Sequence, residues 1–293
     1  YLNCDEPQTV TALTNRNLKE LQMLIGANKF VVIDEAQKVD NIGLTLKIIV
    51  DNLPDIQVIA TGSSAFELRN RLNEPLTGRK LEYQMFQIST NEIYKTLGYI
   101  DIQRMLEPRL IYGSYPDVLN QSADTQMLLR NLTDSYLYKD ILATENLRKP
   151  DLLDKLLRAL AYQVGSEVSY NELAQTVGSD SKTVEKYIEL LEKCFIIFRL
   201  NGLSRNLRNE LKKAKKIYFY DNGIRNAVIQ QFAPLEMRND VGALWENFFI
   251  SERIKRNHYQ QHYCNMYFWR TQSQQEIDYI EERDGMMTVF EIK

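Results

Sequence analysis

The chain contains one short, fully apolar run that ends abruptly in two adjacent carboxylates. Residues 30–37 read FVVIDEAQ, so the apolar residues stop at Asp34 and Glu35. A continuous apolar strand is typical of the middle of a parallel sheet that is covered on both faces. Ligands of such sheets bind at the carboxyl ends of the strands, where Asp34 would hold magnesium and Glu35 would orient an attacking water. The alternative is a buried strand followed by an acidic helix start, because Asp and Glu favour helix N-termini.

The composition is that of a soluble globular protein with two or three domains. The 293 residues are 44% hydrophobic and 26% charged, and no apolar run approaches the ~18 residues that a membrane span requires. Cys4, Cys194 and Cys264 lie far apart, which argues against a disulfide framework and a structural zinc site. We therefore expect a cytoplasmic protein without a membrane anchor. The net charge of -3 gives no global attraction to nucleic acid, so such binding would need a local basic patch.

Both ends of the sequence read as strands. The chain opens on Tyr-Leu-Asn without a methionine and closes on Glu-Ile-Lys. Neither end carries the charged start and apolar stretch of a signal peptide. We therefore expect the sequence to be an interior part of a longer protein.

Residues 1–92 alternate short apolar strands with helical stretches, which predicts an α/β domain with a parallel sheet. After Glu35 a helical pattern runs to Pro54, and residues 57–60 form the next strand, which leads into Thr-Gly-Ser-Ser. Leu-Thr-Gly-Arg at 76–79 precedes another predicted strand. Ser89 and Glu92 then form a capping-box pair that starts a new helix.

The middle of the chain divides into a helical region and a more informative segment. Residues 93–150 are mainly helical, with a turn enforced by Gly and Pro at 112–116, and they indicate no chemistry. Residues 151–222 contain three helical stretches, the second capped by Ser169 and Glu172, followed by strands at 195–200 and 217–220. This order predicts a winged helix-turn-helix.

A basic segment lies in and between those two strands. It contains a single acid, Glu210, among seven cations, namely Arg199, Arg205, Arg208, Lys212, Lys213, Lys215 and Lys216. Such a wing could grip DNA phosphates without reading sequence. A solvated hairpin in a protein-docking winged helix explains the same residues equally well.

Residues 223–293 begin with a helix that carries Glu246 and continue with strands at 266–271, 276–281 and 288–293. Because side chains alternate along a strand, Glu291 and Lys293 share one face of the last strand. Glu246, Asp278 and Glu291 could converge on one or two magnesium ions with Lys293 beside them. Ordinary alternation on a half-exposed sheet is the alternative.

Several segments, in order, are similar to the motifs of one family. FVVIDEAQ is similar to a Walker B strand, VIATGSSAFEL to the strand with the sensor residue, and LTGRK to the Gly-Arg that follows it. YGSYPDVL is similar to a Gly-Gly-Phe-Pro turn, and WENF, EIDYI and FEIK are similar to the acids and the E-x-K of PD-(D/E)XK nuclease-like modules. Together they resemble a widespread bacterial and archaeal family of AAA-type P-loop ATPases with a C-terminal domain of unknown function.

The resemblance implies a fold and a set of roles. The fold would be an α/β P-loop ATPase core, truncated at its N-terminus, then helical and winged-helix regions and a C-terminal α/β nuclease-like region. Asp34 would be the magnesium-binding acid, Glu35 the catalytic base, and Ser63 or Ser64 the sensor of the ATP γ-phosphate. Arg79 would act as an arginine finger toward a neighbouring subunit of a homo-oligomer or as a sensor in its own subunit.

One essential motif of the family is missing. A P-loop requires G-x-x-x-x-G-K-[ST], whose amides cradle the phosphates, and the sequence contains no such run. We expect this Walker A segment upstream in the parent protein and expect these residues alone to bind ATP poorly. The leading hypothesis is an ATPase that couples ATP and Mg2+ to the winged-helix and nuclease-like module. The alternatives are a metal-dependent nuclease and a non-catalytic DNA-binding module.

Overall fold

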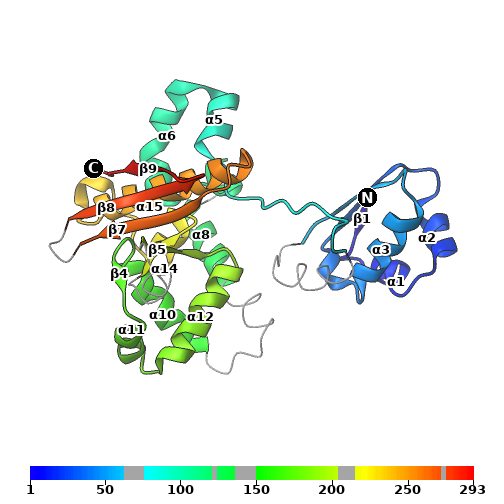
Figure 1. The fold of residues 1–293 in the computed structure, drawn as a ribbon, viewed down its shortest axis with the longest axis horizontal. Coiled ribbons are helices and arrows are strands. Elements are labelled where there is room, and N and C mark those ends of the chain that lie inside the picture. The colour runs from blue at the N-terminus through cyan, green and yellow to red at the C-terminus, as the bar shows by residue number, and fades with distance from the viewer. Residues whose placement is uncertain (63–75, 121–123, 136–149, 204–214, 272–274) are drawn as a thin grey trace. The chain divides into compact units, whose positions relative to one another are not determined.

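The chain folds into two compact units, Tyr1–Tyr83 and Gln84–Lys293 (Figure 1). The computed structural model describes residues 1–62, 76–120, 124–135, 150–203, 215–271 and 275–293. The division falls before the predicted boundary at residue 92, because the helix that Ser89 caps packs within the second unit. Among the described residues, every helix is too short or too polar to cross a membrane.

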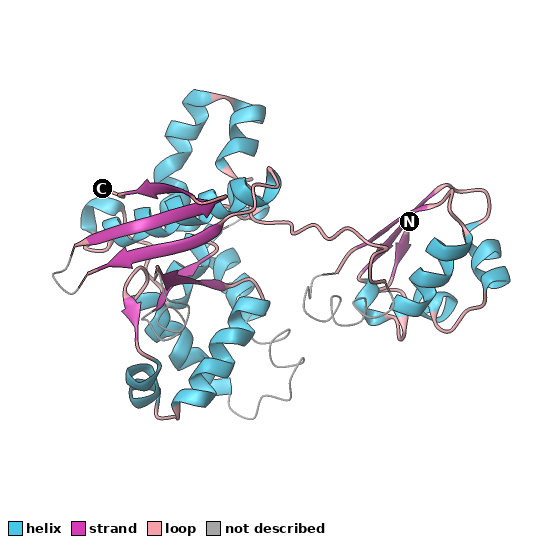
Figure 2. Ribbon diagram, in the orientation of Figure 1, coloured by secondary structure: helices cyan, strands magenta, loops and turns pink. Residues whose placement is uncertain are grey.

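The first unit is a three-stranded parallel sheet whose strands are connected by helices along the chain (Figure 2). Its strands lie side by side in the order β1 (Leu2–Asn3), β2 (Phe30–Asp34) and β3 (Gln57–Ala60). The connections are α1 (Pro7–Leu13) and α2 (Leu18–Ile25) before β2, and η1 (Ala36–Lys38) and α3 (Ile42–Asn52) after it. This arrangement agrees with the predicted α/β class and parallel sheet.

Among the described residues, β2 is fully buried on one face and only half-buried or exposed on the other, whereas we expected cover on both faces. Val31 and Ile33 are 5% and 0% exposed, whereas Phe30 is 52% exposed. The buried face packs against the apolar sides of α2 and α3, which contribute Leu21, Ile25, Ile42, Leu46 and Ile49 to the same core. The apolar run therefore encodes a strand with two different faces, because the described connections supply helices to one side.

The strand predicted after Arg79 does not form. Residues 80–86 are extended but pair with no described strand, and Leu81, Tyr83 and Met85 are 82%, 77% and 89% exposed. The amides of Gln84 and Phe86 donate to the side chains of His258 (3.2 Å) and Tyr259 (3.0 Å) instead of a neighbouring backbone. An alternating apolar segment becomes a strand only where a sheet edge accepts it.

The second unit contains the remaining described helices and one sheet. Its helices are α5 (Thr90–Leu97), α6 (Tyr99–Tyr112), α7 (Pro116–Leu119), α8 (Thr125–Ser135), α10 (Pro150–Tyr162), α11 (Tyr170–Val177), α12 (Ser181–Lys193), α14 (Asn222–Val228), η3 (Leu235–Met237) and α15 (Val241–Tyr259). The capping pairs expected at Ser89 with Glu92 and at Ser169 with Glu172 both begin helices, α5 and α11. These local signals were therefore sufficient to place two helix starts.

The sheet of the second unit has six strands and crosses the predicted boundary at residue 222. Its order is β4 (Glu167–Val168), β6 (Lys215–Phe219), β5 (Ile197–Gly202), β7 (Asn265–Arg270), β8 (Glu276–Arg283) and β9 (Met286–Phe290). Neighbouring strands are antiparallel except for β5 and β7, which pair in parallel through Asn201 with Tyr267 and Gly202 with Phe268. The strands of the predicted wing therefore continue into those of the C-terminal segment.

The last strand ends earlier than predicted, at Phe290 instead of residue 293. Phe290 pairs with Tyr279 on β8. Beyond that pair, the Ile292 amide donates to the Asp278 carboxylate at 2.7 Å. A side chain has therefore replaced a backbone carbonyl, and the sheet ladder stops before Glu291.

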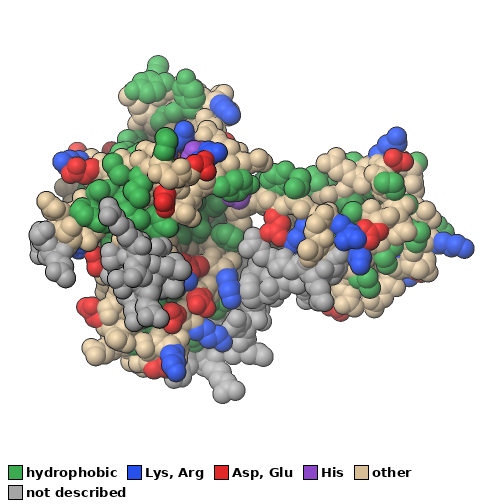
Figure 3. Space-filling model, in the orientation of Figure 1, with side chains coloured by type: hydrophobic (Ala, Val, Ile, Leu, Met, Phe, Trp, Pro, Cys, Tyr) green, Lys and Arg blue, Asp and Glu red, His purple; other side chains and the backbone are tan. Residues whose placement is uncertain are grey.

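The hairpin of α5 and α6 carries an exposed apolar tip (Figure 3). Its two helices meet at Gly98, whose φ of +91° suits glycine. The exposed tip residues are Tyr94, Leu97, Tyr99 and Ile100, at 54%, 53%, 64% and 64%.

The turn at 112–116 is a packing junction. The Asp221 carboxylate is buried, caps α14, and accepts the amides of Ser114 (2.7 Å) and Ile224 (3.2 Å). A Cβ at Gly113 would lie 1.9 Å from Asp221 Oδ1, and one at Gly223 would lie 2.1 Å from the Tyr112 carbonyl oxygen. Both glycines are needed because α6 and α14 approach with no room for a side chain.

We expect Gly223→Ala to lower the stability of the second unit, by about 2 kcal/mol or more, because a buried clash with backbone must be relieved. Gly242→Ala is the matched control. Gly242 is also helical but has nothing within 4 Å of its Cβ position, so its replacement should leave stability unchanged or slightly raised. Urea unfolding of both variants measures the difference, and equal midpoints would contradict the close approach of α6 and α14.

Candidate functional site

Asp34, at the carboxyl end of β2, lies close to residues that flank both neighbouring strands. Its carboxylate accepts hydrogen bonds from the hydroxyls of Thr61, just after β3, and Tyr1, just before β1. These bonds, with Thr61 the larger effect, hold the pKa of Asp34 below its ordinary value. Asp34 is therefore an anion at neutral pH. Sequence reasoning missed Tyr1 and Thr61, because their contacts depend on strand order.

Glu35 follows in a backbone conformation that is unusual for its residue type. Its φ of 53° lies in the left-handed region, which costs a non-glycine residue about 1 kcal/mol or more. Two backbone bonds enforce the turn, from the Thr61 amide to Ile33 and from the Ala36 amide to Thr61, both at 2.9 Å. Gln37 Nε2 then donates to Glu35 Oε2 at 2.7 Å. The structure thus brings both predicted carboxylates to the same sheet edge.

The donors at this edge suit magnesium bound with phosphates. Magnesium prefers oxygen ligands and usually takes one or two carboxylates together with phosphate oxygens and water. Asp34 supplies an anionic carboxylate, and Thr61 supplies a neutral oxygen next to it. The residues present therefore fit the metal, while the amide cradle of a P-loop is absent from the sequence.

Of the other predicted ATP-site residues, only Arg79 is described, and it is not brought to Asp34. Ser63 and Ser64 lie outside the described residues. Arg79 Nε donates to Asp51 at 2.6 Å, and Asp51 lies in the last turn of α3. That end of α3 leads to the start of β3, at the opposite edge of the sheet from Asp34.

Of the predicted C-terminal acids, Glu246 contacts a buried lysine together with Glu276, an acid that was not predicted. Glu246 on α15 accepts from Lys216 Nζ at 3.2 Å and from the Tyr218 hydroxyl at 2.5 Å, both on β6. Lys216 also pairs with Glu276 on β8 at 2.6 Å. Burial raises the pKa of Glu246, a shift that the Lys216 ammonium opposes and that the charge of Asp278 reinforces. Sequence reasoning found Glu246 and Asp278 but missed Tyr218 and Glu276, and it placed Lys216 on an exposed wing.

Glu291 and Lys293 lie at the surface beside this group. They form an ion pair of 2.8 Å with side chains 66% and 81% exposed. Lys293 also interacts electrostatically with Asp278, and its pKa is raised mainly by its hydrogen bond to Glu291. The predicted E-x-K pair is therefore formed, outside the buried group.

The predicted basic wing is partly neutralised. Arg199 pairs with Glu192 and donates to the Tyr170 hydroxyl at 3.0 Å, and Lys216 is 3% exposed between two acids. Lys215 points to the other side of β6, with Nζ 5.1 Å from the Tyr170 ring centroid. The other four cations, Arg205, Arg208, Lys212 and Lys213, lie outside the described residues. Two of the seven predicted phosphate contacts are thus already occupied, Arg199 by residues of α11 and α12 and Lys216 by residues of α15 and β8.

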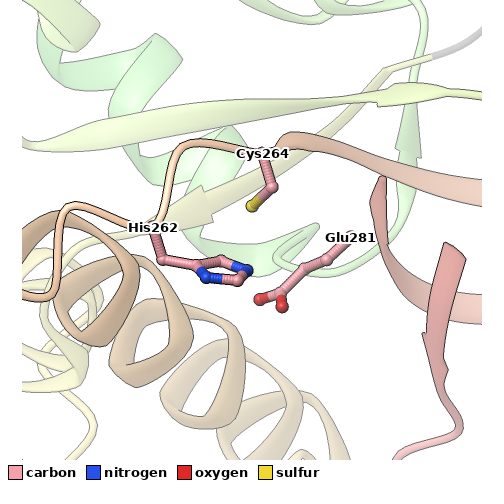
Figure 4. Close-up of side chains that lie close together, drawn as sticks. All are labelled: His262, Cys264 and Glu281. Carbon is pink, nitrogen blue, oxygen red and sulfur yellow. The ribbon is translucent and has the colours of Figure 1, made fainter. Parts of the chain in front are cut away.

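A further group of possible metal ligands lies between the end of α15 and β8 (Figure 4). Ligand atoms of His262, Cys264 and Glu281 lie within 4.8 Å of one another. Glu281 is held by Arg253 and by Asn257 Nδ2 (2.6 Å), and Arg283 lies 2.8 Å from His262 Nδ1. A metal-binding histidine normally donates its second ring N–H to an acceptor, whereas Arg283 offers only donors. These contacts are those of an internal polar network, and we assign no metal to it.

Comparison with known proteins supports an assignment of the first unit. Residues 1–94 match a family model described as an AAA domain, which supports an AAA-type ATPase-like family. Residues 103–235 match a domain of unknown function (DUF8612), and residues 241–293 match another (DUF4143).

Related proteins occur in bacteria and archaea, and those found are described as uncharacterized. One from Mycobacterium tuberculosis is 25% identical over 278 residues, which cover 92% of this chain and 60% of that protein. One from Haemophilus influenzae is 26% identical over 183 residues, which cover 59% of this chain and 46% of that protein. One from Methanocaldococcus jannaschii is 24% identical over 264 residues, which cover 78% of this chain and 55% of that protein. The chain thus spans about half to three fifths of the length of these relatives.

We expect Thr61→Val to raise the pKa of Asp34 toward the ordinary carboxyl value, because the strongest donor to the carboxylate is lost. A carboxyl group whose pKa is lowered in the folded protein stabilises the fold at pH values above its ordinary pKa. This contribution is lost as the pH falls through the lowered pKa. The variant should therefore lose stability at neutral pH and lose less at acid pH. NMR titration of the carboxyl carbon measures the shift, with Thr11→Val on α1 as control. An unchanged Asp34 pKa would show that Thr61 does not hold the carboxylate.

Proposed function

We propose that the protein to which these residues belong binds and hydrolyses ATP with Mg2+. The observation that carries this proposal is the placement of an anionic Asp34 and of Glu35 at one carboxyl edge of a parallel sheet. The AAA domain match over the same residues supports it.

Each residue of this edge has a proposed role. Asp34, with Thr61 beside it, would hold the magnesium ion, which when bound neutralises charge on the phosphates. Glu35, whose backbone is fixed in a left-handed turn, would accept a proton from the attacking water and orient it. Ser63 and Ser64 remain the proposed γ-phosphate sensors.

The phosphate cradle is proposed to come from chain outside residues 1–293. The relatives are longer than this chain, which leaves room for a P-loop segment. Among the described strands, β3 lies at one edge of the sheet and could offer such a segment a strand to pair with. A single protein would then contain both halves of the nucleotide site.

Arg79 is proposed to act toward a neighbouring subunit of a homo-oligomer. Its bond to Asp51, at the far edge of the sheet from Asp34, argues against a sensor role in its own subunit. The side chains of Arg79 and Asp51 are each about 40% exposed. Breaking an exposed ion pair of this kind costs only ~1 kcal/mol. Arg79 can therefore be released to a phosphate at small cost.

Residues 84–293 are proposed to respond to the nucleotide as one body. The helices α10, α11 and α12 with strands β4, β5 and β6 support a winged helix, and the shared six-stranded sheet fixes it to the C-terminal segment. The nucleotide would therefore move this unit as a whole rather than its parts separately.

A protein partner is favoured over DNA for the winged helix. The exposed side of α12 carries Lys182, Lys186 and Lys193 together with Glu185 and Glu189, so its positive charge exceeds its negative charge by only one. A helix that approaches phosphates needs an excess of Lys and Arg.

We expect Glu35→Gln in the ATP-binding protein to preserve ATP binding and reduce turnover by about 100-fold or more, the range for loss of a positioned base. Glu6→Gln, at an exposed acid before α1, is the control and should hydrolyse ATP normally. Steady-state phosphate release and equilibrium nucleotide binding distinguish the two effects. A Glu35→Gln protein with normal turnover would remove Glu35 from the mechanism.

A further inference from the structure

The acid group of the C-terminal segment encloses a buried ammonium. Lys216 is 3% exposed, and its Nζ lies 3.2 Å from Glu246 Oε1 and 2.6 Å from Glu276 Oε1. The same Nζ lies 5.4 Å from the centre of the Phe268 ring. A lysine is almost never this buried unless it is paired, and here two carboxylates from two different elements pair with it.

The predicted metal ligands around this lysine are already committed to protein donors. Glu246 accepts from both Lys216 and Tyr218, and Asp278 Oδ2 accepts the Ile292 amide. Glu291 pairs with Lys293 at the surface. A divalent ion at Glu246 would also lie next to the Lys216 ammonium, and like charges at such distances repel strongly where water is excluded. The donor set therefore does not fit the magnesium that a PD-(D/E)XK region implies.

We propose that Lys216 is the resident cation of this acid group, so that residues 241–293 bind no divalent metal and do not cut nucleic acid by a metal-dependent route. The group has a different function, because Lys216 and Tyr218 belong to β6 while Glu246 and Glu276 belong to α15 and β8. The ion pairs hold β6, a strand of the predicted wing, against α15 and β8 of the C-terminal segment. The loop before β4 also lies against this carboxylate, since a Cβ at Gly165 would be in ordinary contact with Glu246 Oε1 at 3.4 Å.

Electron paramagnetic resonance of Mn2+ tests the exclusion of metal. All variants carry Asp34→Asn, so that the site of the first unit does not contribute. With Lys216 present we expect no bound Mn2+, and with Lys216→Met we expect one Mn2+ that is lost again on adding Asp278→Asn. Lys215→Met is the matched control, because the adjacent side chain points away from Glu246 to Tyr170. It should bind no Mn2+.

Two results would overturn the proposal. The first is stoichiometric Mn2+ binding in the presence of Lys216 that Glu246→Gln or Asp278→Asn abolishes. The second is a folded Lys216→Met protein that binds no Mn2+, since the ammonium would then not be what excludes the metal.

Urea unfolding supplies a test that holds even if Lys216→Met folds poorly. Removing one partner of a buried pair leaves the other charge unpaired, so Lys216→Met and Glu246→Gln should each lower the unfolding midpoint. The double variant should unfold at a higher midpoint than Lys216→Met alone. If the fall in the unfolding midpoint of the double variant equals the sum of the falls of the two single variants, Lys216 and Glu246 are not coupled.

Discussion

The parallel pairing of β5 with β7 is the contact on which the second unit depends. It involves Asn201 with Tyr267 and Gly202 with Phe268, and the Leu203 amide extends it to Phe268 at 2.7 Å. This short ladder joins the strands after α12 to the C-terminal strands in one sheet. Without it, β6 and β8 would belong to separate sheets, and Lys216 could not lie between Glu246 and Glu276.

The first unit depends on a different constraint, which is the order of three parallel strands. Because β2 lies between β1 and β3, its last residue, Asp34, meets a hydroxyl from each neighbour. The same order bonds Thr61 to the backbone on both sides of Glu35 and fixes that residue in its left-handed turn. Sheet topology thus creates the anionic edge from residues that are unremarkable separately.

Local patterns were sufficient for some of these features and insufficient for others. The apolar run before Asp34, the caps at Ser89 and Ser169, and the strands around Asp278 were predictable because each signal lies within a few residues. Lys216 was predicted on an exposed wing. Alternation along the strand shows that Lys215 and Lys216 face opposite sides of the sheet, but it does not show that α15 and β8 cover the side of Lys216. The strand expected after Arg79 failed for the same reason, since its alternation says nothing about whether a sheet edge is available. Long-range pairing is therefore the information that the patterns lack.

We propose that residues 1–293 hold the acidic half of a nucleotide site whose P-loop is supplied elsewhere in the protein. Calorimetric titration of MgATP into residues 1–293, and into the longer protein that contains them, tests it most directly. The account predicts saturable binding to the longer protein, weakened by Asp34→Ala, and none to residues 1–293. Tight binding to residues 1–293 alone would contradict it, because the phosphates would then be held without the proposed cradle.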